Sequence, residues 1–210
     1  MGRPKPLLPW GDRTMVGHTV ATVRAGGWDD VTVVSGGVDR SSMVAAVGAD
    51  TRVLHNEDWQ SGRGGGLQMA LSNLLGGPQN PSSVLIALCD QPLMTADDYR
   101  RLRICLQSES VVATRYPGDK PGVPVAMTGD AARSVPPLGP DQGLQNWLVK
   151  LPSETLRLID CPAALRDVDT PEEYRALRCE LDDAPSFDAE DAVPGIGGLS
   201  SGRFGKSGCG

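Results

Sequence analysis

Short apolar runs alternate with amphipathic stretches along most of the chain. Runs rich in β-branched residues predict strands over residues 31–35, 84–88, 111–114 and 156–159. Apolar residues at helical spacing predict helices over residues 14–25, 67–75, 95–107 and 170–181. The run VLIAL at 84–88 is apolar at every position, which is typical of a strand buried on both faces of a parallel sheet. This alternation predicts an α/β layered sheet with right-handed crossovers.

Capping sequences mark where two of these helices begin. Thr95 precedes Asp98, and Thr170 precedes Glu173, each with the spacing of a capping box. Pro171 adds a proline at the first helical position of the second helix. The pattern ends near residue 181, and residues 182–210 are first acidic and then rich in glycine and serine. We therefore predict one domain over residues 1–181 and a disordered tail over 182–210.

Charge and cysteine content narrow the classes of function. The 210 residues carry 20 basic and 26 acidic side chains, a net charge of −6, which disfavours non-specific binding of nucleic acid. The five cysteines are widely spaced and form no CxxC pair, so neither a structural zinc site nor a disulfide framework is expected. No apolar run resembles a signal peptide or a membrane span. We expect a cytoplasmic protein without a membrane partner.

The N-terminal segment MGRPKPLLPWG combines the basic residues Arg3 and Lys5 with glycine and proline. This composition suits an extended phosphate-binding segment, although a basic terminus without a ligand has the same composition. The segment SGRGGG at 61–66 precedes a helical pattern, so its backbone N–H groups could bind an anion. A mobile surface loop is the alternative there, because the spacing matches neither a Walker loop nor a Rossmann fingerprint.

Carboxylates provide the second half of the candidate chemistry. Asp90 follows the strand predicted at 84–88, and ligands of open α/β sheets bind beyond the carboxyl ends of strands. Asp167 and Asp169 alternate on one short extended stretch and project to the same face. Two carboxylates from distant segments could hold Mg²⁺, although Asp90 could also form a turn and Asp169 could cap a helix. His18 is expected to be a packed or surface residue, so phosphoryl-type chemistry is implied rather than nucleophilic catalysis.

Six segments, in this order, resemble motifs of the molybdenum-cofactor nucleotidyltransferases, and most closely their cytidylyltransferase branch. They are MGRPKPLLPWG at 1–11, NEDWQSGRGGGL at 56–67, LCDQPLMT at 88–95, KPGVPV at 120–125, GPDQG at 139–143 and DVDTPEEY at 167–174. The resemblance covers residues 1–177 and is specific through the number of ordered matches. It implies a Rossmann-like three-layer sheet of the nucleotide-diphospho-sugar transferase type. The family's first strand and glycine-rich turn precede the position of Met1, so the first strand is expected to be missing.

The resemblance also implies a reaction and its partners. The enzyme would transfer CMP from CTP to the phosphate of molybdenum-bound molybdopterin and release pyrophosphate, with Mg²⁺ as cofactor. A molybdoenzyme or its maturation chaperone would be a further partner. Carried over by position, the implied catalytic residues are Arg3, Lys5 and Asp90. The implied nucleotide-binding residues are Gly2, Arg3, Lys5, Asn56, Gly62, Gly64, Gly65, Gly66 and Leu67, and the implied metal ligands are Asp90 and Asp169.

Departures from the family pattern leave alternatives open. Gly66 stands where the family has serine, Val123 where it has histidine, and Leu144-Gln145 where it has Ala-Arg. The acceptor could therefore be a sugar phosphate or another small phosphate, and GTP could replace CTP. A protein of another class, an inactive nucleotide- or cofactor-binding protein for molybdoenzyme maturation, is the second alternative.

Overall fold

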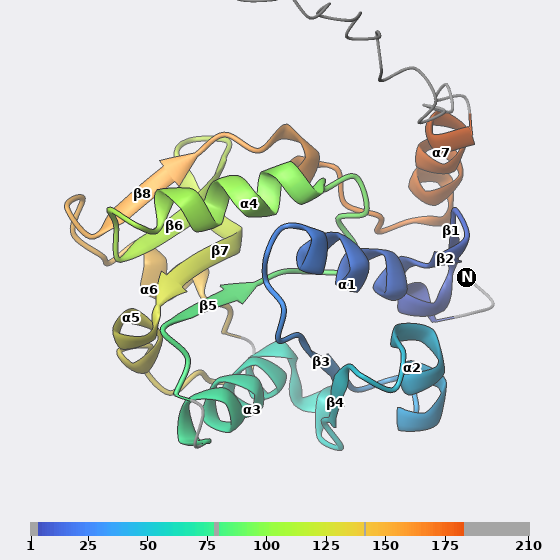
Figure 1. Ribbon diagram of the computed structural model, residues 1–210, viewed down its shortest axis with the longest axis horizontal. Coiled ribbons are helices and arrows are strands. Elements are labelled where there is room, and N and C mark those ends of the chain that lie inside the picture. Colours follow the sequence, from blue (N-terminus) through green and yellow to red (C-terminus); the bar gives the residue numbers. More distant parts are fainter. Residues whose placement is uncertain (1–3, 78–79, 141, 183–210) are drawn as a thin grey trace, which may run out of the picture.

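A computed structural model of the protein describes residues 4–77, 80–140 and 142–182. These residues form an α/β arrangement in which helices cover both faces of a central sheet (Figure 1). Gly2, Arg3 and the predicted tail beyond Asp182 lie outside the described residues. The part of the chain that is described contains no helix with the length and apolarity needed to cross a membrane.

The main sheet has four strands in the order β5-β7-β6-β8. They are β5 (Ser83–Ile86), β6 (Val111–Tyr116), β7 (Lys120–Thr128) and β8 (Leu156–Ile159). β7 pairs antiparallel with both β5 and β6, whereas β6 and β8 are parallel. The apolar run at 84–88 predicts a strand with parallel neighbours, and this prediction is wrong for β7, the strand that pairs with β5. Apolar residues on both faces of a strand show that both faces are covered, but they do not show the direction of the neighbouring strand.

A second, two-stranded sheet pairs β3 (Thr32–Ser35) in parallel with β4 (Arg52–His55). Within the described residues, no strand is hydrogen-bonded to the other edge of β3 or to the edge of β5 that faces away from β7. The sheet is thus divided between β3 and β5. Near the N-terminus, β1 (Pro9–Trp10) and β2 (Arg13–Thr14) form a short hairpin.

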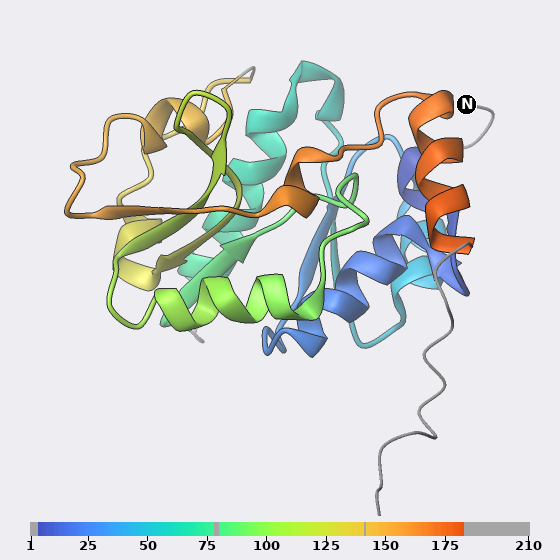
Figure 2. The same cartoon turned by 90° about the horizontal axis from the view of Figure 1, so that it is seen from above.

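Two helical layers enclose the main sheet (Figure 2). α1 (Met15–Ala25) and α4 (Ala96–Cys105) cover one face, and α3 (Arg63–Gly76), α5 (Gly129–Arg133) and α6 (Gln145–Leu148) cover the other. Alternation along β6 explains the division, because Val112 packs with the first layer while Val111 and Ala113 pack with the second. The remaining helical elements are α2 (Arg40–Val47), α7 (Pro171–Asp182) and the short η1 (Lys5–Leu7), η2 (Trp59–Ser61) and η3 (Pro162–Leu165).

Helices with capping sequences begin where the sequence predicts. Thr95 accepts from the backbone N–H of Asp98, and the Asp98 carboxylate accepts from the backbone N–H of Thr95, which completes the predicted capping box of α4. The same exchange joins Thr170 and Glu173 at the start of α7. By contrast, the pattern predicts no element over β4, α2, α5 or α6, and α3 begins at Arg63 instead of residue 67.

Candidate active site

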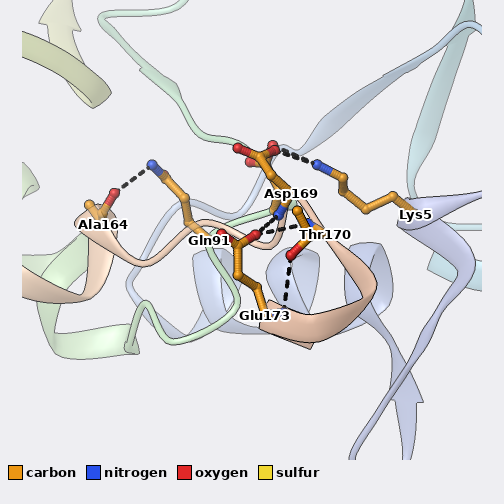
Figure 3. Close-up of polar contacts among 7 residues, drawn as sticks. Lys5, Gln91, Ala164, Asp169, Thr170 and Glu173 are labelled. Atoms are coloured by element: carbon orange, nitrogen blue, oxygen red, sulfur yellow. Dashed lines mark hydrogen bonds and ion pairs between the residues drawn. The ribbon is translucent and has the colours of Figure 1, made fainter. Parts of the chain in front are cut away.

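The structure brings three predicted site residues together although they come from distant parts of the chain. The ammonium of Lys5 lies 2.8 Å from Oδ1 of Asp169 (Figure 3). It also lies 3.7 Å from Oδ2 of Asp90. The side chains of Lys5 and Asp90 are 28% and 27% exposed, so both are shielded yet reachable from solvent. The result is one ammonium between two carboxylates just beyond the end of β5.

Backbone and side-chain contacts fix this arrangement. The backbone N–H of Val168 donates to the carbonyl of Asp90 at 2.8 Å, which joins the segment before α7 to the loop after β5. The hydroxyl of Tyr174 donates to the carbonyl of Pro9 at 2.5 Å and holds α7 against the N-terminal hairpin. A buried apolar cluster packs the same two parts together, and its members are Leu8, Trp10, Met15, Val168 and Leu177. Lys5 and Asp169 therefore meet because α7 docks on the N-terminal segment.

Local structure differs from one sequence expectation here and decides one alternative that the sequence leaves open. The segment with Lys5 is predicted to be extended, but residues Lys5–Leu7 form a 3-10 turn that places the ammonium toward the carboxylates. Asp169 is not the cap of α7, because the side chain of Thr170 accepts the capping hydrogen bond from the backbone N–H of Glu173. The Asp169 carboxylate is thereby left available for Lys5.

The charges of the cluster affect each other's protonation. Partial burial lowers the pKa of Lys5, but the hydrogen bond with Asp169 and the charges of Asp90 and Asp169 outweigh it and raise the pKa above its usual 10.5. Lys5 is therefore a permanent cation at neutral pH. Burial is also the main cause that raises the pKa of the neighbouring Cys89 thiol to about 11, so this cysteine stays protonated and is no nucleophile.

The donor set fits a divalent cation that prefers oxygen ligands. Oδ1 of Asp90 is buried and has no hydrogen-bond partner within the described residues, and the same is true of Oδ1 of Asp167. A buried unpaired carboxylate oxygen is costly unless a cation or a donor satisfies it. In the described part of the chain no group of three or more His, Cys, Asp or Glu side chains is placed to hold a metal. A metal ion here would consequently need ligands from substrate phosphates or water, which is the usual situation of Mg²⁺.

Gln91 supports the loop of Asp90, a role that no pattern in the sequence predicts. It is only 1% exposed, and its Nε2 donates to the hydroxyl of Tyr116 at 2.8 Å and to the carbonyl of Ala164 at 2.9 Å (Figure 3). The Tyr116 hydroxyl in turn lies 2.7 Å from the carbonyl of Val123. A polar residue directly after Asp90 is the only sequence signal for this network, since its partners are far away along the chain.

The glycine-rich segment is helical rather than a turn that precedes the helix. Gly62, with φ of +124°, precedes α3 in a conformation that favours glycine, and Gly64, Gly65 and Gly66 lie in the first turn of the helix. The backbone N–H of Gly64 donates to the carbonyl of Pro140 at 2.9 Å, so the segments at 61–66 and 139–143 are in contact. This donor is therefore not free for an anion.

Two further predicted nucleotide-binding residues, Asn56 and Leu67, lie close to this helix start. Asn56 is buried, and its Nδ2 lies 3.6 Å from the position that a side chain at Gly66 would occupy. Leu67 packs against the core cluster beneath α3. His18 packs as expected, with Nε2 3.1 Å from the carbonyl of Pro92.

Two known proteins are similar to this chain over most of its length. Nicotine blue oxidoreductase of Paenarthrobacter nicotinovorans is 30% identical over 202 residues, which cover 84% of this chain and 90% of that protein. The structure of Rv0371c from Mycobacterium tuberculosis H37Rv, solved in complex with manganese, superposes with a TM-score of 0.68 at 27% identity, over 84% of this chain and 92% of that one.

A more distant structure supports the fold alone. The 4-diphosphocytidyl-2C-methyl-D-erythritol synthase from Anaerococcus prevotii DSM 20548 superposes with a TM-score of 0.64 at 14% identity, over 85% of this chain and 90% of that one. The expected Rossmann-like fold of the nucleotide-diphospho-sugar transferase type is thereby confirmed. The family model described as "MobA-like NTP transferase domain" matches residues 1–155, and the chain belongs to this family.

Proposed function

We propose that the protein is a Mg²⁺-dependent nucleotidyltransferase that moves CMP from CTP to the phosphate of molybdenum-bound molybdopterin. The observation that carries the proposal is the contact of the Lys5 ammonium with the carboxylates of Asp90 and Asp169, in a chain of an NTP transferase family. A lysine is a point charge that suits phosphate groups, and two carboxylates suit a hard cation.

The chain's residues would act by position and charge. An oxygen of the acceptor phosphate attacks the α-phosphorus of CTP, the bond from that phosphorus to the bridging oxygen breaks, and pyrophosphate leaves with the electron pair. Lys5, together with Arg3, would stabilise the charge that develops on the leaving group. Asp90 and Asp169 would hold Mg²⁺, which neutralises charge on the phosphates when it is bound. Because the acceptor is itself the nucleophile, the protonated thiol of Cys89 needs no role.

Two parts of the site would bind different parts of the substrate complex. The helix start at residues 62–66 together with Asn56 would take the base and ribose. The metal would lie where Oδ1 of Asp90 is buried without a partner among the described residues. Manganese in the structure of Rv0371c is consistent with a divalent cation in this family.

Pyrophosphate release tests the proposal directly. The assay compares CTP with GTP in the presence of Mg²⁺ and molybdenum cofactor, for the wild type and for Asp90→Asn. We expect release with CTP, and loss of about 100-fold or more in Asp90→Asn with an unchanged melting temperature. Asp30→Asn removes an equally charged but exposed carboxylate and should leave the rate unchanged. Full activity of Asp90→Asn would contradict the metal-ligand role.

A second candidate function follows from one relative. Nicotine blue oxidoreductase shares 30% identity over 84% of this chain, so reduction of nicotine blue is an activity to be tested. Loss of the blue colour in the presence of a supplied reductant, without any nucleotidyl transfer, would favour that function. Transfer to a sugar phosphate in place of molybdopterin would retain the chemistry and change only the acceptor.

A further inference from the structure

Trp59 has a larger exposed fraction than the other three tryptophans. Trp10 and Trp147 are 1% and 9% exposed, and the indole N–H of Trp28 donates to the carbonyl of Tyr99. Trp59 keeps 47% of its surface exposed. A single exposed apolar side chain is ordinary on a protein surface. An exposed tryptophan is less ordinary when its position is rigid, because its large apolar area is then held in water.

The indole of Trp59 lies against the backbone of a glycine pair. A side chain added at Gly36 would overlap Cβ of Trp59, and one added at Gly37 would lie 3.5–3.6 Å from three carbons of its six-membered ring. Gly36 and Gly37, which follow β3, therefore cover part of the Trp59 side chain. The exposed 47% of the residue remains open to solvent.

Hydrogen bonds hold the segment of Trp59 in place. The backbone N–H of Asn56 donates to the carbonyl of Ser35 at 2.7 Å, and Oδ1 of Asn56 accepts from the backbone N–H of Asp58 at 3.2 Å. Trp59 then opens the short η2, and the N–H of Gly62 donates to its carbonyl at 3.3 Å. The ring is thus held before any ligand arrives, which lowers the entropic cost of stacking.

The position of Trp59 suits a ligand of the candidate active site. Trp59 follows β4 by four residues and opens the short η2 that leads into α3, whose first turn includes the predicted nucleotide-binding glycines. Gly66 of this turn and Asn56 lie next to each other, as the 3.6 Å separation given above shows. Trp59 borders this segment along the chain and through the hydrogen bond from the N–H of Gly62 to its carbonyl.

We propose that the open face of Trp59 is a stacking platform for a planar heteroaromatic ring of the ligand. Aromatic rings stack on indole with little demand on sequence or substituents, because each has a π-face. The ring could belong to the nucleobase or to a pterin-type acceptor. The inference deepens the proposed function and rests on it for the choice of these two ligands.

Binding without turnover tests the platform separately from catalysis. Saturation-transfer NMR, which detects ring protons, gives dissociation constants for CTP and for pterin-6-carboxylate as the acceptor probe. We expect Trp59→Ala to weaken binding of one probe about tenfold, while Trp59→Phe stays within about threefold of the wild type. The probe that is affected identifies the ring that stacks. Ile104→Ala removes another exposed apolar side chain, on α4 and 57% exposed, and should change neither constant.

A second variant perturbs the platform without removing the indole. The methyl group of Gly36→Ala would overlap Cβ of Trp59 and must displace the indole, so this variant should weaken binding of the same probe that Trp59→Ala weakens. Unchanged binding of both probes to a folded Trp59→Ala would overturn the platform. Pyrophosphate release by that same variant would leave the proposed function intact, so the two failures can be told apart.

Discussion

Gln91→Glu tests whether the buried amide beside Asp90 is needed as a donor. The substitution keeps the shape of the side chain and removes both N–H groups. Gln91 is 1% exposed, and its Oε1 has no hydrogen-bond partner among the described residues. The side chain is therefore held through its donors, to the Tyr116 hydroxyl at 2.8 Å and the Ala164 carbonyl at 2.9 Å.

The number of protons in this network determines how much stability Gln91→Glu should lose. Three acceptors, which are the Tyr116 hydroxyl and the carbonyls of Val123 and Ala164, share two amide protons and one hydroxyl proton. An ionised carboxylate in place of the amide leaves only the hydroxyl proton, so two of the three acceptors lose their bond and a negative charge is buried among acceptors. At about 1 kcal/mol for each lost bond and about 1–3 kcal/mol for the unpaired group, the cost is about 3 kcal/mol. For a domain of this size the melting temperature should fall by about 10 °C.

The cost should also depend on pH. Burial raises the pKa of a carboxyl above its unfolded value of about 4.3, and the protonated form regains one donor. A group whose folded pKa is raised binds its proton more tightly when folded, so the variant gains stability as the pH falls toward about 5. Urea unfolding at about pH 7.5 and about pH 5.5, followed by circular dichroism, measures both effects.

Gln107→Glu makes the same chemical change on the surface and should be neutral at both pH values. A loss smaller than about 1 kcal/mol at the higher pH in Gln91→Glu, or an equal loss at both pH values, would refute the donor count.

Three further substitutions test local features of the fold. Gly64→Ala should destabilise the protein by about 1–3 kcal/mol, because its methyl group would clash with the carbonyl oxygen of Gly139. Gly65→Ala is the control: its methyl group meets only Nδ2 of Asn56 at 3.9 Å, so it should be neutral or stabilising. Thermal melting of the two variants measures the difference. Backbone N–H donors lower the pKa of Glu173 below its usual 4.5, so its contribution to stability is present above pH 4.5 and is lost as the pH falls through the lower folded value. The stability difference between wild type and Glu173→Gln should accordingly vanish on acidification, and a difference that persists at about pH 2 would contradict this cause. Thr95→Ala should cost about 1 kcal/mol in urea unfolding through loss of the α4 cap, and no cost would mean that the capping box contributes nothing.

Local signals in the sequence account for the elements that are predicted well. Side chains within three residues of each other form the caps of α4 and α7, so these helix starts are visible in the sequence. The antiparallel pairing of β5 is not visible, because burial on both faces leaves no mark of strand direction. The early start of α3 at Arg63 has a tertiary cause. Contacts of Gly64 with the segment around Pro140 hold the glycines in a helix that their own propensity disfavours.

Part of the candidate site depends on contacts between residues far apart in the chain. Gln91 meets partners 25 and 73 residues away, and nothing in the neighbourhood of residue 91 identifies them. Single-sequence patterns report which face of an element is buried, but they do not report which polar groups face one another. Strand ends and alternation in the sequence suggest that Asp90 pairs with a carboxylate at 167 or 169, whereas only the order of the family motifs predicts that Lys5 lies with them.

The candidate site also depends on the position of α7, because Asp169 directly precedes this helix and lies far from Lys5 along the chain. Lys5 and Asp169 are 164 residues apart, and their 2.8 Å contact requires α7 to lie against the N-terminal hairpin. Leu177 is buried in the shared apolar cluster, Tyr174 and Leu181 pack against it, and the Tyr174 hydroxyl donates to Pro9. A fully buried leucine contributes about 2 kcal/mol and each half-buried side chain less, so the docking of this helix is weaker than the stability of a whole domain. Because a weakly docked terminal helix opens before the core unfolds, the carboxylate of Asp169 should leave the cluster while Asp90, fixed by Gln91 and the main sheet, stays in place.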